Sequence, residues 1–356
     1  MPEKTDFERG TAASIIISNY NYAPFLAAAI DSALAVDWPD LEVIVVDDGS
    51  TDQSREIIQT YGSRIVPVFR DNGGQVSAYE SGFALSRGEL IVFLDSDDLL
   101  ESQILREAAA VWYEGVSKVQ VQMRVIDREG HPTGSVFPPF YIVPTPEQIR
   151  RWILTTSACP TPPGSGNIFS RAMVQKILPV QDRFDYAGDS YTLAAAPVLG
   201  DVVTIAKPLA LYRVHGRNDG AMIEIDPRKF SGELRRAHRR FAYMQRLAEK
   251  EGLRADSKAV NFSLANVPYR VASFCLCPDS HPIDNDSAKR ILRDAVSAAV
   301  RPQGLTSGAR ASILLWTVVV MASPAKMARA LIRWRFVPTA RPQFLSVLLR
   351  AFRAVR

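Results

Sequence analysis

The chain of 356 residues has few cysteines and lacks the common phosphate-binding glycine motifs. Its three cysteines, Cys159, Cys275 and Cys277, fit neither a disulfide framework nor a zinc pattern, which favours a reducing compartment. No expected strand is followed by Gly-x-Gly-x-x-Gly, and Gly-x-x-x-x-Gly-Lys-Ser/Thr does not occur. A dinucleotide fold and a P-loop are therefore excluded. If phosphates bind, a cation must balance their charge.

A hydrophobic run long enough to cross a bilayer is also missing. The first ten residues are charged and polar, so no secretory signal is expected. Residues 311–322 are strongly apolar, but they fall well short of the roughly 20 residues that a membrane span needs. We expect a cytoplasmic protein in which this segment is a buried or interfacial helix.

Negative charge is absent from the last part of the chain. Residues 301–356 contain ten Lys/Arg and no Asp/Glu, so the net charge of +4 leaves −6 for residues 1–300. Segments 327–336 and 344–353 alternate basic residues with Leu, Phe and Trp at helical spacing, which is typical of helices on an anionic membrane. Nucleic acid is not expected, because no binding motif accompanies the charge. We expect peripheral association with the inner face of the cell membrane; the solvated face of an accessory helical domain is the alternative.

Acidic residues follow two of the expected strands. A hydrophobic run at 91–94 ends in Asp95-Ser96-Asp97-Asp98, and another at 41–46 ends in Asp47-Asp48. Buried carboxylates repel one another unless a cation or a hydroxyl-rich ligand lies between them. The carboxyl ends of parallel strands form one edge of a sheet, where ligands bind. A metal–nucleotide site is predicted there; the alternative is that the second acidic group makes a turn and caps a helix at 99–111.

The hydrophobic pattern predicts a doubly wound α/β sheet, mostly parallel and flanked by helices. Strands are expected at 14–18, 41–46, 65–69 and 91–94, alternating with helices at 24–35, 53–61 and 75–85. The strands are almost continuously Val, Ile and Leu, which indicates cover on both faces. With 47% hydrophobic residues the chain can bury a catalytic domain at 1–225 and carry a helical accessory region at 226–356.

Four motifs resemble those of the family 2 glycosyltransferases of bacterial type, in the same order and spacing. They are Ser14-Ile-Ile-Ile-Ser-Asn-Tyr-Asn, Val46-Asp-Asp-Gly-Ser-Thr-Asp, Asn72-Gly-Gly and Gly88-Glu-Leu-Ile-Val-Phe-Leu-Asp-Ser-Asp-Asp. The resemblance is strong over residues 14–100, weaker as far as Asn218 and absent beyond. It implies the GT-A fold and transfer of a sugar from a nucleoside diphosphate donor.

The resemblance also implies roles for individual residues. Asp48 would bind the base or ribose of the donor, Asp95 would approach the ribose or sugar, and Asp97 would coordinate Mg²⁺ or Mn²⁺. The metal would neutralise the departing diphosphate. His215 would be a further metal ligand, and Arg213 or Arg217 would contact the diphosphate. Other donor contacts are expected from Ser18, Tyr20, Asp47, Gly74 and Ser96.

A general base is needed to take the proton of the acceptor hydroxyl. By resemblance this is Asp189, with Asp185 as the second choice. The family usually has Glu before this Asp, and here Gly188 stands in its place. The alternative for Asp189 is a helix cap.

Two further regions carry weaker signals. In the loop at 160–169, Ser165 and Asn167 are either near the donor sugar and acceptor or part of an ordinary surface connection. The family pattern after Asn72 would have a second Asn where this chain has Glu80. This difference is expected to alter contacts beneath the donor site.

The expected function is that of a metal-dependent, inverting glycosyltransferase in cell-envelope glycan or polysaccharide synthesis, with a saccharide or lipid-linked acceptor. A sugar nucleotidyltransferase would need a Gly-rich, Arg-containing loop after the first strand, and residues 18–21 are not one. A catalytically silent nucleotide-sugar binding protein at the membrane surface is the remaining alternative. The motifs do not set the donor base, the sugar or the oligomeric state.

Overall fold

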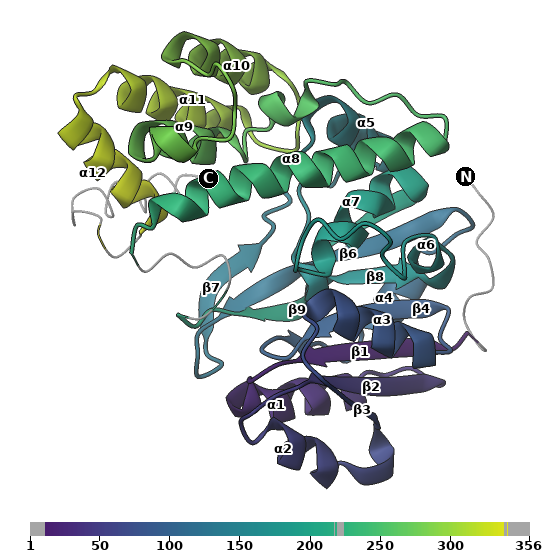
Figure 1. The fold of residues 1–356 in the computed structure, drawn as a ribbon. Coiled ribbons are helices and arrows are strands. Elements are labelled where there is room, and N and C mark those ends of the chain that lie inside the picture. The colour runs from purple at the N-terminus through teal and green to yellow at the C-terminus, as the bar shows by residue number, and fades with distance from the viewer. Residues whose placement is uncertain (1–10, 217, 219–223, 338–339, 341–356) are drawn as a thin grey trace. The chain divides into compact units, whose positions relative to one another are not determined.

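The computed structural model describes residues 11–216, 218, 224–337 and 340 (Figure 1). The chain groups into two compact units. The first is Met1–Leu154, Cys159–Val214 and Arg240–Ala255, and the second is Thr155–Ala158, His215–Arg239 and Asp256–Arg356. The expected single division at 225/226 differs from these units, because Tyr243 and Leu247 of helix α8 (Pro227–Lys250) pack into a core of the first.

In the described part of the first unit, nine strands form one mixed sheet (Figure 1). They are β1 (Ala13–Asn19), β2 (Leu41–Asp48), β3 (Val66–Arg70), β4 (Leu90–Asp95), β5 (Leu99–Leu100), β6 (Val116–Ile126), β7 (Pro132–Phe137), β8 (Asn167–Ser170) and β9 (Asp201–Arg213). The order is β3-β2-β1-β4-β8-β6-β9-β5, with β7 paired to β6. The first four are parallel, β8 is antiparallel to both neighbours, and β6 and β9 are parallel. The predicted α/β class with a mostly parallel sheet is confirmed.

Helices cover both faces of the sheet. The helices of this unit are α1 (Ala23–Leu34), α2 (Ser54–Thr60), α3 (Gln75–Leu85), α4 (Ile104–Ala109), α5 (Pro146–Thr156), α6 (Arg171–Gln175), α7 (Asp189–Leu199) and the last part of α8. In β1, Ile15 and Ile17 pack with α1 and α4, whereas Ile16 packs with α3 and α7. The strand is buried along its whole length, which explains why it reads as an unbroken β-branched run.

The second unit is helical and has its own hydrophobic core. It contains the first part of α8 together with α9 (Val267–Leu276), α10 (Ala288–Val300), α11 (Ser307–Ala322) and α12 (Ala325–Phe336). Phe230, Val271, Ile291 and Ile332 are among its buried side chains. Helix α8 is divided between this unit and the first.

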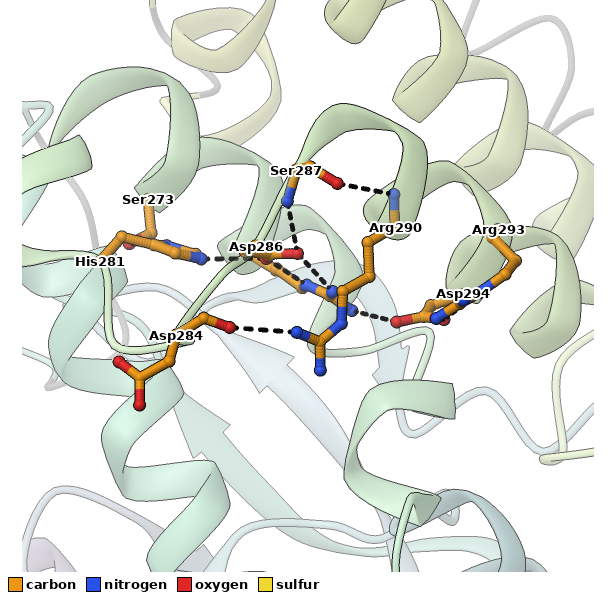
Figure 2. A network of polar contacts seen from close by, with 9 residues as sticks. Ser273, His281, Asp284, Asp286, Ser287, Arg290, Arg293 and Asp294 are labelled. Carbon is orange, nitrogen blue, oxygen red and sulfur yellow. Dashed lines mark hydrogen bonds and ion pairs between the residues drawn. The ribbon is translucent and has the colours of Figure 1, made fainter.

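A buried ionic network joins three segments of the second unit (Figure 2). The guanidinium of Arg270 on α9 donates to both carboxylate oxygens of Asp286, at 2.7 and 2.8 Å, and to Asp294 on α10 at 3.0 Å. His281 lies between Ser273 and Asp286, with its ring nitrogens 2.9 and 3.0 Å from their oxygens. Since buried charges are costly without partners, this network fixes the loop before α10 to α9.

The apolar and basic segments of the second unit form α11 and α12. Within the described residues, no helix is both long and apolar enough to cross a membrane. Segment 327–336 lies in α12, but Ala328 and Ile332 of this helix are buried in the core. Its apolar face is therefore covered by protein rather than available to a membrane. The other expected amphipathic segment, 344–353, lies outside the described residues.

Candidate active site

Three strand ends meet at one edge of the sheet. In the register of β1 with its neighbours, Ser18 is opposite Asp95 of β4, and Asn19 is opposite Asp47 of β2. The two acidic groups predicted from separate strands therefore lie on either side of the end of β1. Ser18 and Asp47 are buried. The sheet brings these residues together as predicted.

The end of β2 is held by Asn19, the last residue of β1. Asn19 Nδ2 donates to Asp47 at 3.1 Å and to the hydroxyl of Ser50 at 3.1 Å. The second oxygen of Asp47, Oδ2, has no hydrogen-bond partner and lies 3.8 Å from the guanidinium of Arg55. An acceptor with spare hydrogen-bonding capacity is thus present here. Tyr20, another predicted donor contact, is 47% exposed at the adjoining loop.

Asp48 fixes the loop that leads into α3. Its carboxylate accepts the backbone N–H of Gly74 at 2.7 Å and that of Gly73 at 3.1 Å, and it is paired with the guanidinium of Arg70. Gly74 has a φ of 83°, a conformation that favours glycine. Asp48 therefore shapes the loop around the expected donor base. Arg70 was missed by the sequence reasoning, although it is the register partner of Asp48 in the expected strand pair.

The Asp95–Asp98 cluster concentrates negative charge in a poorly hydrated place. Burial raises the pKa of Asp95 well above its usual value, and the charges of Asp98, Asp97 and Asp189 raise it further. Burial and the charge of Asp97 likewise raise the pKa of Asp98. Asp98 Oδ1 accepts the backbone N–H of Arg213 at 3.0 Å, while its buried Oδ2 has no hydrogen-bond partner. Uncompensated charge of this kind favours a bound cation.

The cluster does not cap a helix. Leu99–Leu100 forms strand β5, and α4 begins only at Ile104. The alternative in which these acids start a helix at 99–111 is therefore wrong, because Leu99 and Leu100 pair with β9 in the sheet. Ser96, expected to contact the donor, is buried within this turn.

A divalent cation fits the chemistry of this cluster. No group of three or more His, Cys, Asp or Glu side chains in the described residues is arranged to hold a metal. Magnesium, however, is commonly held by one or two carboxylates while substrate phosphates and water supply its other ligands. Asp98 Oδ2 is a buried carboxylate oxygen without a hydrogen-bond partner, and metal ligation by Asp97 stays a prediction.

Arg213 supports the cluster from β9. Its Nε donates to the carbonyl oxygen of Asp97 at 2.9 Å, and Nη1 donates to the carbonyl of Arg128 at 2.9 Å. The side chain also lies over the ring of Phe25, 5.2 Å from its centroid. Arg213 thus positions the backbone of the metal candidate, and its expected contact with a diphosphate stays a prediction.

His215 follows Arg213 but belongs to the second unit. It is buried, and its backbone N–H donates to Asn218 Oδ1 at 2.6 Å. Metal ligation by His215 stays a prediction. Arg217 lies outside the described residues.

Asp189 faces the same loop as Asp95. A Cβ placed on Gly164 would lie 3.6 Å from Asp95 Oδ2 and 3.7 Å from Asp189 Cβ. Asp189 is the first residue of α7, and the capping position before it is Gly188, which supplies no side-chain cap. The predicted base is therefore close to the predicted donor acid.

Gln75 links these two acids through hydrogen bonds. Its Nε2 donates to Asp95 Oδ1 at 2.8 Å, and its Oε1 accepts the backbone N–H of Gly188 at 2.9 Å. One amide side chain at the start of α3 thus fixes both Asp95 and the start of α7. Sequence reasoning missed Gln75, because its partners lie far away along the chain.

Gly188, where the family usually has Glu, has a steric explanation. A Cβ at this position would lie 2.6 Å from the ring of Tyr79, closer than real contacts allow. Tyr79 is fully buried, stacks on Phe93 with ring centroids 4.0 Å apart, and has no partner for its hydroxyl. Burial raises the pKa of Tyr79 well above its usual value, and the charges of Asp95 and Asp189 raise it further. A tyrosine ring therefore occupies the space beside Gly188, the residue before Asp189.

Glu80 anchors the segment that precedes the base. Its carboxylate accepts the backbone N–H of Val180 at 2.8 Å and pairs with Arg183 at 2.5 Å. Arg183 also donates to the hydroxyl of Ser77 at 2.7 Å. Glu80 thus tethers α3 to the segment before α7, and its expected effect on contacts beneath the donor stays a prediction.

The other candidates have supporting contacts. Asp185 is 1% exposed and accepts the Ser190 hydroxyl at 2.5 Å, which favours a role in holding the start of α7. Ser165 accepts the backbone N–H of Asp95 at 3.1 Å, and Asn167 donates to the carbonyl of Pro163 at 2.7 Å. Both shape the loop that covers the site.

The sequence is similar to proteins of one known family. Residues 14–178 match the model described as glycosyl transferase family 2. An uncharacterized glycosyltransferase of Nostoc, alr2836, is 35% identical over 215 residues, covering 58% of this chain and 66% of that protein. TarS of Staphylococcus aureus, a poly(ribitol-phosphate) beta-N-acetylglucosaminyltransferase, is 30% identical over 126 residues, covering 33% of this chain and 22% of TarS.

The fold is also that of a solved transferase structure. The crystal structure of S. aureus TarS 1–349 in complex with UDP-GlcNAc aligns with a TM-score of 0.52 at 17% identity, over 87% of this chain and 90% of that one. At this identity the likeness concerns the fold, which is GT-A as the motifs implied. The chain spans about two thirds of the Nostoc relative and about a quarter of two rickettsial ones. By its matched domain and its relatives, the chain belongs to glycosyltransferase family 2.

Proposed function

We propose that the protein is a metal-dependent, inverting glycosyltransferase that moves a sugar from a nucleoside diphosphate donor to a hydroxyl acceptor. The observation that carries the proposal is the convergence of Asp95 and Asp189 on Gly164, with Gln75 bonded to Asp95 and to the backbone next to Asp189. A donor acid and a base at one loop suit a displacement in which donor and acceptor meet.

The donor is expected to lie along the ends of β1, β2 and β4. The loop held by Asp48 and the spare acceptor on Asp47 suit a base or ribose, and Asp95 suits the ribose or sugar. Asp97, with Asp98 beside it, would hold Mg²⁺ or Mn²⁺. When bound, this ion would neutralise charge on the leaving diphosphate.

Asp189 would take the acceptor proton while the acceptor hydroxyl attacks the anomeric carbon from the face opposite the leaving group. The bond to the diphosphate breaks as the new glycosidic bond forms, so the configuration inverts. Proton removal by a positioned base contributes about 10²–10⁴ in rate. Gln75 and Glu80 would keep Asp189 in place.

The acceptor and the location of the protein are parts of the same proposal. We expect a saccharide or lipid-linked acceptor in cell-envelope glycan synthesis, and a cytoplasmic enzyme on the inner face of the membrane. The relative TarS is named as a poly(ribitol-phosphate) beta-N-acetylglucosaminyltransferase, so the acceptor in its name is a polymer. The basic C-terminal region supports the membrane part.

Donor binding by calorimetry tests the proposal. UDP-N-acetylglucosamine, UDP-glucose, GDP-mannose and dTDP-glucose are titrated into the protein with manganese and, separately, with EDTA. We expect one donor class to bind with metal only, and Asp97→Ala to abolish that binding. Asp182→Ala is the matched control, because the Asp182 side chain is 76% exposed and forms a surface ion pair with Arg246.

Each outcome separates the alternatives. Binding with turnover supports a transferase, whereas metal-dependent binding without hydrolysis or transfer to any acceptor tested supports the silent binding protein. Failure of every donor with metal would contradict both.

A further inference from the structure

Helix α11 has an apolar row that the described residues leave exposed. Leu315, Val318 and Val319 are 65, 43 and 42% exposed, although Thr317 and Val320 of the same helix are buried. With exposed Ala322, the row repeats at intervals of three and four residues, which places it on one side of the helix. Such a row is unusual on a water-facing helix and marks an interaction surface.

The neighbouring helix α12 presents basic side chains to solvent. Lys326, Arg329 and Arg333 are exposed and lie on one side of the helix, whereas Ala328 and Ile332 on the other side are buried in the core. Only Ser323 and Pro324 separate α11 from α12. The guanidinium of Arg335 lies over the ring of Trp316, 4.9 Å from its centroid, which ties the two helices together.

We propose that these two rows form one docking face for an anionic lipid bilayer, defined by Leu315, Val318 and Val319 on α11 and Lys326, Arg329 and Arg333 on α12. The apolar row would enter the boundary between headgroups and acyl chains, and the basic row would face the phosphates. This assignment differs from the expectation drawn from sequence, which gave the membrane contact to the apolar side of 327–336. That side is covered by protein, so α11 supplies the apolar surface instead.

The charge of the region selects a lipid surface over a second copy of the chain. Residues 301–356 contain ten Lys/Arg and no Asp/Glu, so two such faces would repel each other. An apolar row beside a basic one, on helices with no acidic residue, is the pattern of interfacial helices. Each basic side chain near an anionic membrane strengthens partitioning by about fivefold at physiological salt.

The docking face rests on the membrane location given in the proposed function, but it does not depend on sugar transfer and can be tested without a known donor. The full-length protein is sedimented with vesicles of phosphatidylcholine alone or of phosphatidylcholine mixed equally with phosphatidylglycerol, at low and at high salt. We expect binding to the anionic vesicles only, weaker at high salt. Leu315→Glu/Val319→Glu and Lys326→Glu/Arg329→Glu should each weaken it by about tenfold or more.

Two controls accompany these variants. Leu85→Glu introduces one negative charge at a leucine that is 56% exposed in the first unit, and it should leave vesicle binding unchanged. The α11 variants should keep the melting temperature of the wild type, since the altered side chains face solvent.

A polarity-sensitive dye on Leu315→Cys, in a background where Cys159, Cys275 and Cys277 are replaced by Ser, should shift to the blue with anionic vesicles. Absence of wild-type binding overturns the proposal. Loss of binding in the basic variant but not in the α11 variant overturns the insertion of the apolar row. A dye at Leu315→Cys that shows no blue shift with any vesicle also overturns the proposal. That result is expected if residues 341–356 or a second copy of the chain cover the apolar row.

Discussion

Gly188 and Tyr79 share one small space beside the predicted base. The ring of Tyr79 lies where any larger residue at position 188 would place its Cβ. Gly188 also donates its N–H to Gln75, so a change here would disturb the start of α7. The absence of the usual Glu is therefore matched by a bulky residue on α3.

The substitution Gly188→Ala tests this pairing. We expect a loss of about 1–3 kcal/mol in the free energy of unfolding, because the added carbon overlaps the Tyr79 ring. In a Tyr79→Ala background the same substitution should cost much less, as measured by urea unfolding of all four variants. Gly232→Ala, which meets nothing within 4 Å, is the control and should be neutral or stabilising. Equal costs in both backgrounds would contradict the steric account.

Asp189→Asn tests the base. The amide cannot take the acceptor proton, so turnover should fall by about 10²–10⁴, while the affinity for the donor is unchanged. Rates and calorimetry on the same preparations measure both. Asp185→Asn should instead lower stability, because Asp185 is buried against Ser190 and Arg240. A wild-type rate for Asp189→Asn would remove Asp189 as the base.

The acidic residues of the site could be predicted from the sequence, but their partners could not. Asp47, Asp48, Asp95 and Asp97 follow hydrophobic runs, so their place at the sheet edge follows from strand direction alone. Gln75 sits on α3 and meets a glycine at position 188, far along the chain. No spacing rule predicts such a contact, because it depends on the packing of two helices on the same sheet face.

At the scale of elements, the four expected strands and three expected helices of the first hundred residues are present, with small shifts at their ends. Their burial on both faces makes the hydrophobic pattern strong. Strands β5, β6, β7 and β8 were not predicted. Of these, β5 has only two residues and β7 is exposed along its whole length. Neither carries a periodic signal, and both depend on pairing with β9 or β6.

The Arg270 network makes the second unit sensitive to acid (Figure 2). Burial alone would raise the pKa of Asp286, but hydrogen bonds from Arg270 and His281 outweigh it and hold the pKa well below its usual range. The folded-state pKa is thus depressed, so this stabilisation is complete above the unfolded value of about 3.9 and is lost as the pH falls toward the folded value.

Asp286→Asn should therefore lower stability at neutral pH by about 3–5 kcal/mol, because Arg270 remains buried with fewer charged partners. Between pH 4 and pH 2 the variant should lose less stability than the wild type, by up to about 1.4 kcal/mol per pH unit. Urea unfolding at neutral pH measures the first effect, and hydrogen exchange of α9 and α10 between pH 4 and pH 2 measures the second. Asp284→Asn is the control: Asp284 is exposed, and only its backbone carbonyl accepts a bond from Arg290. Equal acid sensitivity of the two variants would contradict the role of Asp286.

At the scale of the whole molecule, binding of the donor should slow hydrogen exchange in the first unit only. We expect manganese with a bound sugar nucleotide to protect the ends of β1, β2 and β4 and the start of α3 from hydrogen exchange. Peptides from α9 to α12 should exchange as before, because the predicted donor contacts other than His215 lie in the first unit. Mass spectrometry of the full chain with and without UDP-N-acetylglucosamine and the other donors measures this. Protection confined to α9–α12 would place the ligand elsewhere.

Helix α8 is one uninterrupted run of 24 residues that both hydrophobic cores use. Its early residue Phe230 is fully buried in the second unit, and its later residues Tyr243 and Leu247 pack into the first. A protein truncated near residue 226 would lack the part of α8 that packs on the first unit. The truncated protein should therefore be insoluble. Recombination between relatives is limited in the same way. An exchange of the C-terminal helices keeps the first unit intact only when the crossover falls after Ala255.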